Sequence, residues 1–172
     1  MLSVPYFAHR NDEIFQVGAH GSAEDLKVTV SGDPRPQQRP RVTRTAWNGS
    51  GRVHAYNPDA THVRNFRRAL ETVLGLPAFT NTPPAFTRAA DLKLTVLFQV
   101  RRPESHYRAG RLVSGAPIYP SNADIDNYVK FVMDAMQGII YYDDRRIHVV
   151  NAAKIFTAKE RMGRTFIHVQ KI

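Results

Sequence analysis

Carboxylates are crowded into one short segment of an otherwise basic chain. The segment DIDNYVKFVMDAMQGIIYYDD holds five of the fifteen Asp and Glu residues. These are Asp124, Asp126, Asp134, Asp143 and Asp144. Carboxylates that lie close together raise each other's pKa unless a cation neutralises them. The crowding therefore favours a metal site. The formal net charge of +9 indicates that such a metal could act on a negatively charged substrate.

The spacing of these acids is helical. Asp126, Lys130 and Asp134 recur at intervals of four, which places them in one row along a helix. Asp124 stands at the start of that helix, where a carboxylate can cap backbone N–H groups. Mg²⁺ takes hard oxygen ligands and keeps several waters, so Asp124 and Asp126 with Asp144 would suit it. For Asp144 to join the other two, the chain must run back along a helix of about 18 Å.

Each acid also has an ordinary alternative role. Asp124 could be a plain helix cap, Asp126 and Lys130 a surface ion pair, and the pair at 143–144 a hairpin turn. Those roles together would leave five neighbouring acids uncompensated, so we favour the metal site. Other site types lack their residues: the chain has no cysteine and no GxxxxGK[ST], GxSxG or HExxH motif, and Val129 stands where an EF-hand needs glycine.

The positive charge indicates a polyanionic partner, because clustered Lys and Arg displace counterions from phosphates. The alternative is a chain that is merely basic. The stretch DPRPQQRPRVTR, residues 33–44, contains three prolines, which prevent helix formation and predict an extended loop. That loop would present four arginines outward: Arg35, Arg39, Arg41 and Arg44.

Hydrophobic periodicity predicts a mixed α+β domain. Alternation favours strands at 26–32, 51–58 and 91–102, and a closing pair of strands at 145–156 and 164–172. Spacings of three and four favour helices at 59–74 and 126–137. The order predicts a single domain in which two main helices pack on a mixed sheet. Two stretches rich in proline, 76–90 and 103–123, are expected to be loops.

Residues 1–25 show no clear period and are interpreted as an N-terminal extension or poorly ordered arm, so the domain proper is 26–172. The first residues lack a basic region followed by an apolar one, which argues against a secretory signal. No apolar run approaches the roughly 20 residues that span a bilayer. We therefore expect a cytoplasmic protein with no membrane association.

The acidic segment resembles the RusA family of Holliday-junction resolvases. That family's pattern is D-x-D-N-x-x-K-x-x-x-D-A-L, then a glycine, then D-D. The matching positions here are Asp124, Asp126, Asn127, Lys130, Asp134, Ala135, Gly138, Asp143 and Asp144. The stretch GDPRPQQRPRVTR followed by YNP is similar to the family's early proline–arginine loop. Three positions depart from the pattern: Ala123 replaces a proline, Met136 a leucine and Arg146 a glutamine.

The resemblance implies a RusA-like nuclease fold and a homodimeric endodeoxyribonuclease that depends on Mg²⁺, with Mn²⁺ as a substitute. Such an enzyme resolves four-way DNA junctions by paired symmetric nicks, in recombination and repair at the nucleoid. By position, Asp124, Asp126 and Asp144 would be the catalytic, metal-binding acids and Lys130 a catalytic lysine. Arg145 and Arg146 would join the loop arginines in holding DNA phosphates.

Two other functions stay open. The chain could be a basic protein that binds DNA junctions or single strands without cleaving them. It could also be a related nuclease whose substrate is a replication fork, a flap or RNA.

Overall fold

The computed structural model describes residues 7–9, 23–39, 41–45, 52–76, 82–159 and 161–172. Its main sheet has five strands in the order β1-β2-β9-β5-β8. Their bounds are β1 (Phe7–His9), β2 (Asp25–Ser31), β9 (Arg164–Lys171), β5 (Leu92–Val100) and β8 (Ile147–Phe156). Strands β5 and β8 are parallel, and the other neighbouring pairs are antiparallel. The mixed sheet and α+β class predicted from the sequence are confirmed.

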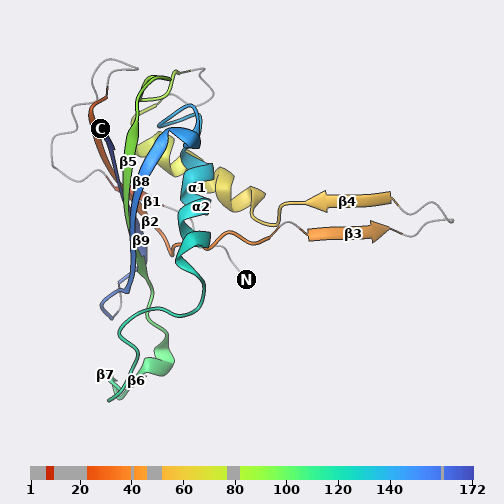
Figure 1. Ribbon diagram of the computed structural model, residues 1–172. Coiled ribbons are helices and arrows are strands. Elements are labelled where there is room, and N and C mark those ends of the chain that lie inside the picture. Colours follow the sequence, from red (N-terminus) through yellow and green to blue (C-terminus); the bar gives the residue numbers. More distant parts are fainter. Residues whose placement is uncertain (1–6, 10–22, 40, 46–51, 77–81, 160) are drawn as a thin grey trace.

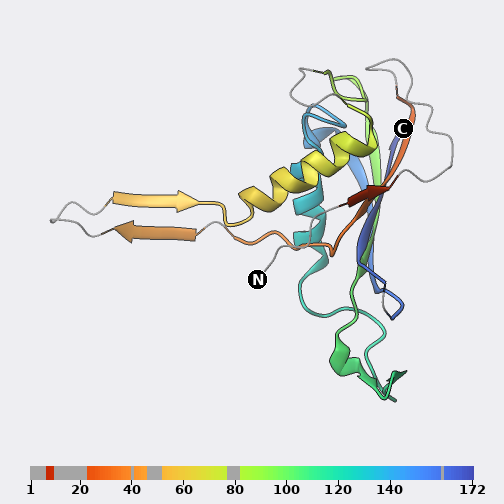
Figure 2. The same ribbon diagram turned by 180° about the vertical axis from the view of Figure 1, so that it is seen from behind.

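Helices α1 (Ala60–Val73) and α2 (Ile125–Met136) lie on the same face of the sheet (Figures 1 and 2). Side chains alternate along β5 between buried and half-buried, so one face of the strand contributes to the core. The helices join that core through aromatic contacts. Phe66 of α1 meets Phe131 of α2 edge to face at 5.6 Å, and Tyr128 lies 5.2 Å from Phe98 of the sheet. The result is two layers with one core between them.

Helix α2 forms because its apolar residues recur on one side. Five of its side chains are buried: Tyr128, Phe131, Val132, Ala135 and Met136. The helix ends just before Gly138, whose φ of +83° suits glycine far better than other residues. Arg67 of α1 donates to the Gln137 carbonyl at 2.7 Å. This bond satisfies a backbone carbonyl at the end of α2 that has no partner within the helix, and it joins the two helices. Because the apolar side of α2 packs on the core, the row of Asp126, Lys130 and Asp134 lies on the other side of the helix.

The proline–arginine stretch is not entirely a loop. Strand β3 (Arg41–Thr45) pairs with β4 (Arg52–Tyr56) in an antiparallel hairpin that projects from the body (Figures 1 and 2). Residues 33–39 have no regular structure, as predicted. The difference arises because β3 is stabilised by pairing with β4, whose partner residues are seven to fifteen positions away in sequence, and the composition of residues 41–45 alone does not reveal that pairing.

The last two strands, β8 and β9, were expected to pair with each other, but they are not neighbours in the sheet. Strand β9 lies between β2 and β5, while β8 lies at the edge of the sheet beside β5. The buried side chains of Ile167 and Val169 agree with this central position. Within the extension, Phe7–His9 adds strand β1 next to β2, and residues 1–6 and 10–22 lie outside the described residues.

Between β5 and α2 the chain makes a long excursion away from the sheet (Figure 1). It holds the short helix η1 (Glu104–His106) and a small hairpin of β6 (Tyr107–Arg108) and β7 (Arg111–Leu112). A second short helix, η2 (Asp144–Arg146), precedes β8. No helix in the described ranges is long and apolar enough to cross a bilayer.

Candidate functional site

The first two acids of the motif lie together at the start of α2. Asp124 occupies the N-cap position in extended backbone, with φ −70° and ψ 145°, but its side chain makes no capping hydrogen bond. Asp126 lies in the first turn of the helix. Both residues are exposed. Because Asp124 does not cap the helix, its carboxylate and that of Asp126 are available to a ligand from solvent.

The rest of the acidic row continues along the same helix. Lys130 is exposed, and within the described residues it forms no ion pair with Asp126. Asp134 is half-buried and accepts a 2.7 Å hydrogen bond from the side-chain amide of Gln37. The backbone N–H of Gln37 also donates to the Asn127 carbonyl at 2.9 Å. Through Gln37, the proline–arginine loop is attached directly to the polar side of α2.

Further contacts hold this loop in place. The Gln38 N–H donates to the carboxylate of Asp59, a buried residue just before α1. Asp33, at the start of the loop, is ion-paired with Arg101 at 3.5 Å. Because these contacts come from α1, α2 and the end of β5, the loop has a defined position beside the acids.

The loop arginines remain exposed at three of the four predicted positions, Arg35, Arg39 and Arg41. The side chain of Arg44 lies outside the described residues. Burial lowers the pKa of His62, and the nearby positive charge of Arg35 lowers it further. Arg35 therefore lies close to the first turn of α1, with its charge at the surface.

Arg145 and Arg146 each form an ion pair with a carboxylate of the same chain. Arg145 donates to both carboxylate oxygens of Asp143, with a shortest contact of 2.6 Å, and these bonds lower the pKa of Asp143 to about 2. Arg146 is ion-paired with Asp91 at 3.2 Å and donates to the Arg88 carbonyl. Asp143 is thus neutralised by a neighbouring arginine and needs no metal for that purpose.

Asp144 lies beyond the other end of α2. The hydroxyl of Tyr141 donates to the Met133 carbonyl at 2.8 Å, and burial, then the charges of Asp144 and Asp134, raise the pKa of Tyr141. The strand that runs back along α2 is β8, and it begins after Asp144 (Figure 1). The β8 residue that reaches the start of α2 is Lys154, which donates to the Ala123 carbonyl.

Asp124 and Asp126 therefore do not meet Asp144 in a single chain. Across the described ranges, no three Asp, Glu or His side chains lie close enough together to hold a metal ion. The pair Asp124 and Asp126 by itself fits Mg²⁺, which proteins commonly bind through one or two carboxylates together with waters and substrate phosphates. Within one chain, the structure offers two of the three predicted ligands.

Two residues of this region were missed by sequence reasoning. Gln37 connects the loop to α2, but an amide between prolines and arginines gives no signal of such a contact. Lys154 had a detectable signal, because it is a lone charge in the largely apolar strand segment IHVVNAAKIF. Its side chain also lies 5.9 Å from the ring of Tyr128.

Comparison with known proteins adds two findings. A protein-family model described as Endodeoxyribonuclease RusA matches residues 31–170. A curated relative, the uncharacterized protein YqaN of Bacillus subtilis (strain 168), is 27% identical over 137 residues, which are 80% of this chain and 92% of the relative. The family match includes the proline–arginine loop, all of α2 and Asp144.

Proposed function

The chain belongs to the RusA endodeoxyribonuclease family, and from this membership we propose that it is a Mg²⁺-dependent nuclease that resolves four-way DNA junctions by paired symmetric nicks. Mn²⁺ is the expected substitute for Mg²⁺. The site of action is the cytoplasm, at the nucleoid, where such junctions arise during recombination and repair.

One observation carries this proposal: the arginine-rich loop is hydrogen-bonded to the helix that carries the acids. Gln37, which lies between Arg35 and Arg39 in the sequence, contacts both Asn127 and Asp134 of α2, the helix that carries Asp126 and Lys130. Arginines that bind phosphates position DNA without reading its sequence. A DNA backbone held by the loop would lie next to the exposed carboxylates.

We assign the chemistry to the start of α2. Asp124 and Asp126 would hold Mg²⁺, which when bound lowers the pKa of a water and polarises a phosphate. Lys130, one helical turn from Asp126, would stabilise the charge that develops on the phosphate oxygens. Attack by water on the phosphorus is expected to leave a 5′-phosphate and a 3′-hydroxyl, ends that a ligase can rejoin.

A homodimer suits both the substrate and the position of Asp144. A four-way junction has two-fold symmetry, and one isologous interface between two copies places two identical sites on it. Two copies would also allow Asp144 of one chain to approach Asp124 and Asp126 of the other. We keep Asp144 as the third proposed ligand on this basis.

Replacing Asp126 by Asn tests the assignment, because the amide removes an anionic ligand and adds no bulk. We expect nicking of a four-way junction in Mg²⁺ to fall by at least about 100-fold while binding in EDTA stays within about two-fold. Glu24→Gln is the matched control, since Glu24 is an exposed carboxylate paired with Lys171 on the sheet. Wild-type nicking by Asp126→Asn would contradict the metal assignment.

A panel of substrates separates the alternative functions. A junction resolvase cleaves the four-way junction in preference to forks, flaps, duplex and RNA. Preference for a fork, a flap or RNA would keep the nuclease and change its substrate. Tight, salt-sensitive binding with no cleavage in Mg²⁺ or Mn²⁺ would identify a binding protein instead.

A further inference from the structure

A basic cavity of about 180 Å³ lies at one edge of the sheet, outside the site described above. Its lining residues come from the segments that follow β5 and β8 and from the excursion. They are Arg101, Arg102, Glu104, Tyr107, Thr157, Ala158, Lys159 and Arg161. Four of these side chains are cationic and one is a carboxylate, so a ligand of this cavity should be an anion.

The position of the cavity follows from the parallel pairing of β5 and β8 in the main sheet. Strands β5 and β8 run in the same direction, so both end at the same edge, and the Thr157 N–H continues their pairing by donating to the Val100 carbonyl at 2.8 Å. In open sheets, ligands bind in the crevice outside the carboxyl ends of parallel strands. The start of α2 is at this edge too, because Lys154 of β8 contacts Ala123.

The cavity is therefore close to the acids. Thr157 follows Lys154 by three residues, a distance of about 10 Å along a strand. A nucleic-acid strand that passes over Asp124 and Asp126 needs only a few nucleotides to reach the cavity.

Internal contacts fix the cavity walls. The guanidinium of Arg102 donates to the Pro117 carbonyl at 2.7 Å and lies 4.3 Å from the centre of the Phe156 ring. The Thr157 hydroxyl donates to the Arg161 carbonyl at 3.2 Å, which closes the turn after β8. Lys159 lies across the ring of Tyr107 at 5.5 Å. These contacts attach the excursion to the sheet, so the wall formed by Tyr107 has a defined position.

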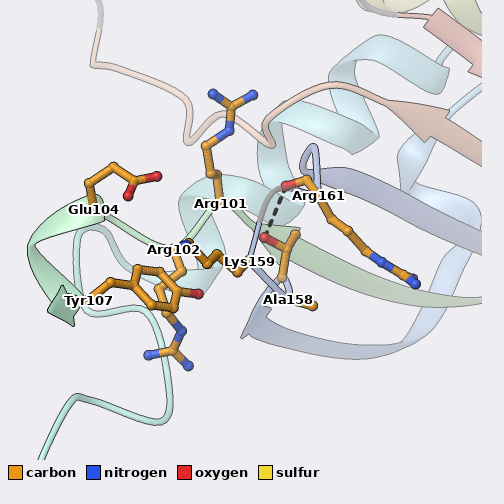
Figure 3. A pocket seen from close by; sticks show the side chains of 8 residues that line it. Arg101, Arg102, Glu104, Tyr107, Ala158, Lys159 and Arg161 are labelled. Carbon is orange, nitrogen blue, oxygen red and sulfur yellow. Dashed lines mark hydrogen bonds between the residues drawn. The ribbon is translucent and has the colours of Figure 1, made fainter. Parts of the chain in front are cut away.

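The cations around the cavity do not converge on one point. In Figure 3, Lys159 and Tyr107 lie near the centre, while the guanidinium groups of Arg101, Arg102 and Arg161 point in different directions. Sites for small ligands are mostly apolar with a few convergent polar groups. Cations that spread outward instead suit an extended polyanion, whose charges are distributed along a chain.

We propose that this cavity is a second DNA-contact surface, which binds backbone phosphates of a strand leaving the α2 site. The inference rests on the proposed nuclease function for its substrate. It extends the DNA path across the carboxyl edge of β5 and β8, on cations that differ from those of the proline–arginine loop. A junction arm held at both places would be fixed in direction relative to Asp124 and Asp126.

The test is a salt titration of junction binding by the double variant Lys159→Gln/Arg161→Gln. Both residues are exposed, and because Lys159 also contacts Tyr107, circular dichroism and urea denaturation check that the double variant keeps the wild-type fold. Binding of a fluorescent four-way junction is measured in EDTA, without cleavage, from about 50 to about 200 mM salt. Each lost phosphate contact lowers the slope of log affinity against log salt by about 0.9. We expect the magnitude of this negative slope to be smaller by about 1.8, and binding to be weaker at every salt concentration.

The matched control is Lys27→Gln/Lys171→Gln. It removes the same charge, and Lys171 pairs with Leu92 at the opposite end of β5. The control should keep the wild-type slope. The proposal is overturned if the cavity variant keeps the wild-type slope, or if both variants change it equally. Wild-type protein that binds junctions but never cleaves them would refute the nuclease function and leave this surface intact.

Discussion

The acids of the α2 segment differ in what surrounds each carboxylate. Asp143 is held by Arg145, and Asp134 accepts a hydrogen bond from Gln37. Asp124 and Asp126 are exposed at the start of the helix. Crowding in sequence therefore did not produce a cluster of three or more acids within the part of the chain that the structure describes, and Asp124 and Asp126 form an open pair. For Asp143 the neutralising cation is Arg145, whereas the sequence argument favoured a metal ion for the crowded acids as a group.

Arg145→Gln should raise the pKa of Asp143 from about 2 toward its ordinary 3.8, because hydrogen bonds from the Arg145 side chain and backbone are the main causes of the lowered value. A carboxylate with a lowered pKa stabilises the fold above pH 3.8, and this contribution is lost as the pH falls toward 2. Carboxyl-carbon NMR titration measures the midpoint. Arg146→Gln is the control and should leave Asp143 unchanged; an unaltered midpoint in Arg145→Gln would refute the assigned cause.

At the scale of elements, local periodicity was sufficient to predict both helices and the main strands. The buried row of α2 and the alternation of β5 are properties of neighbouring residues, so a sequence displays them. The β3–β4 hairpin depends on pairing between residues seven to fifteen positions apart, and the central place of β9 depends on pairing with segments far away in the sequence. The position of Asp144 was uncertain for the same reason, since it depends on where the chain turns back.

Gly163 shows how closely the proline–arginine loop packs on the sheet. Its N–H donates to the Asp33 side chain at 3.1 Å, and its carbonyl accepts from the Gly32 N–H at 2.8 Å. A Cβ at this position would lie 2.4 Å from Asp33 Oδ1 and 2.8 Å from the Gln99 carbonyl oxygen. Because backbone atoms surround the position, a side chain fits only if the start of the loop moves.

Gly163→Ala should therefore lower the free energy of unfolding by about 1–3 kcal/mol, the usual cost of overpacking. Urea denaturation measures it. Gly115→Ala is the comparison: nothing lies within 4 Å of its added Cβ, but its φ is +78°, so only about 1 kcal/mol of backbone strain is expected. If Gly163→Ala were no more destabilising than Gly115→Ala, the close packing of loop and sheet would be disproved.

On the scale of the whole molecule, one chain holds the proposed metal ligands in two separate regions. Asp124 and Asp126 lie at the carboxyl edge of β5 and β8, with the basic cavity, whereas Asp144 lies where β8 begins. Strand β8 separates Asp144 from Asp124 and Asp126, because β8 starts after Asp144 and places Lys154 at the start of α2. If all three acids act in one site, a second copy has to supply the third.

Mixing two inactive variants tests this arrangement. In a shared site, a heterodimer of Asp126→Asn and Asp144→Asn has one site with both substitutions and one with neither. Random exchange makes about half of the dimers mixed, so about a quarter of the sites would be intact. We expect each variant alone to be inactive and the mixture to nick one strand of a four-way junction without the paired second nick. If each site used acids from a single chain, every site in the mixture would carry a substitution, and no nicking would appear.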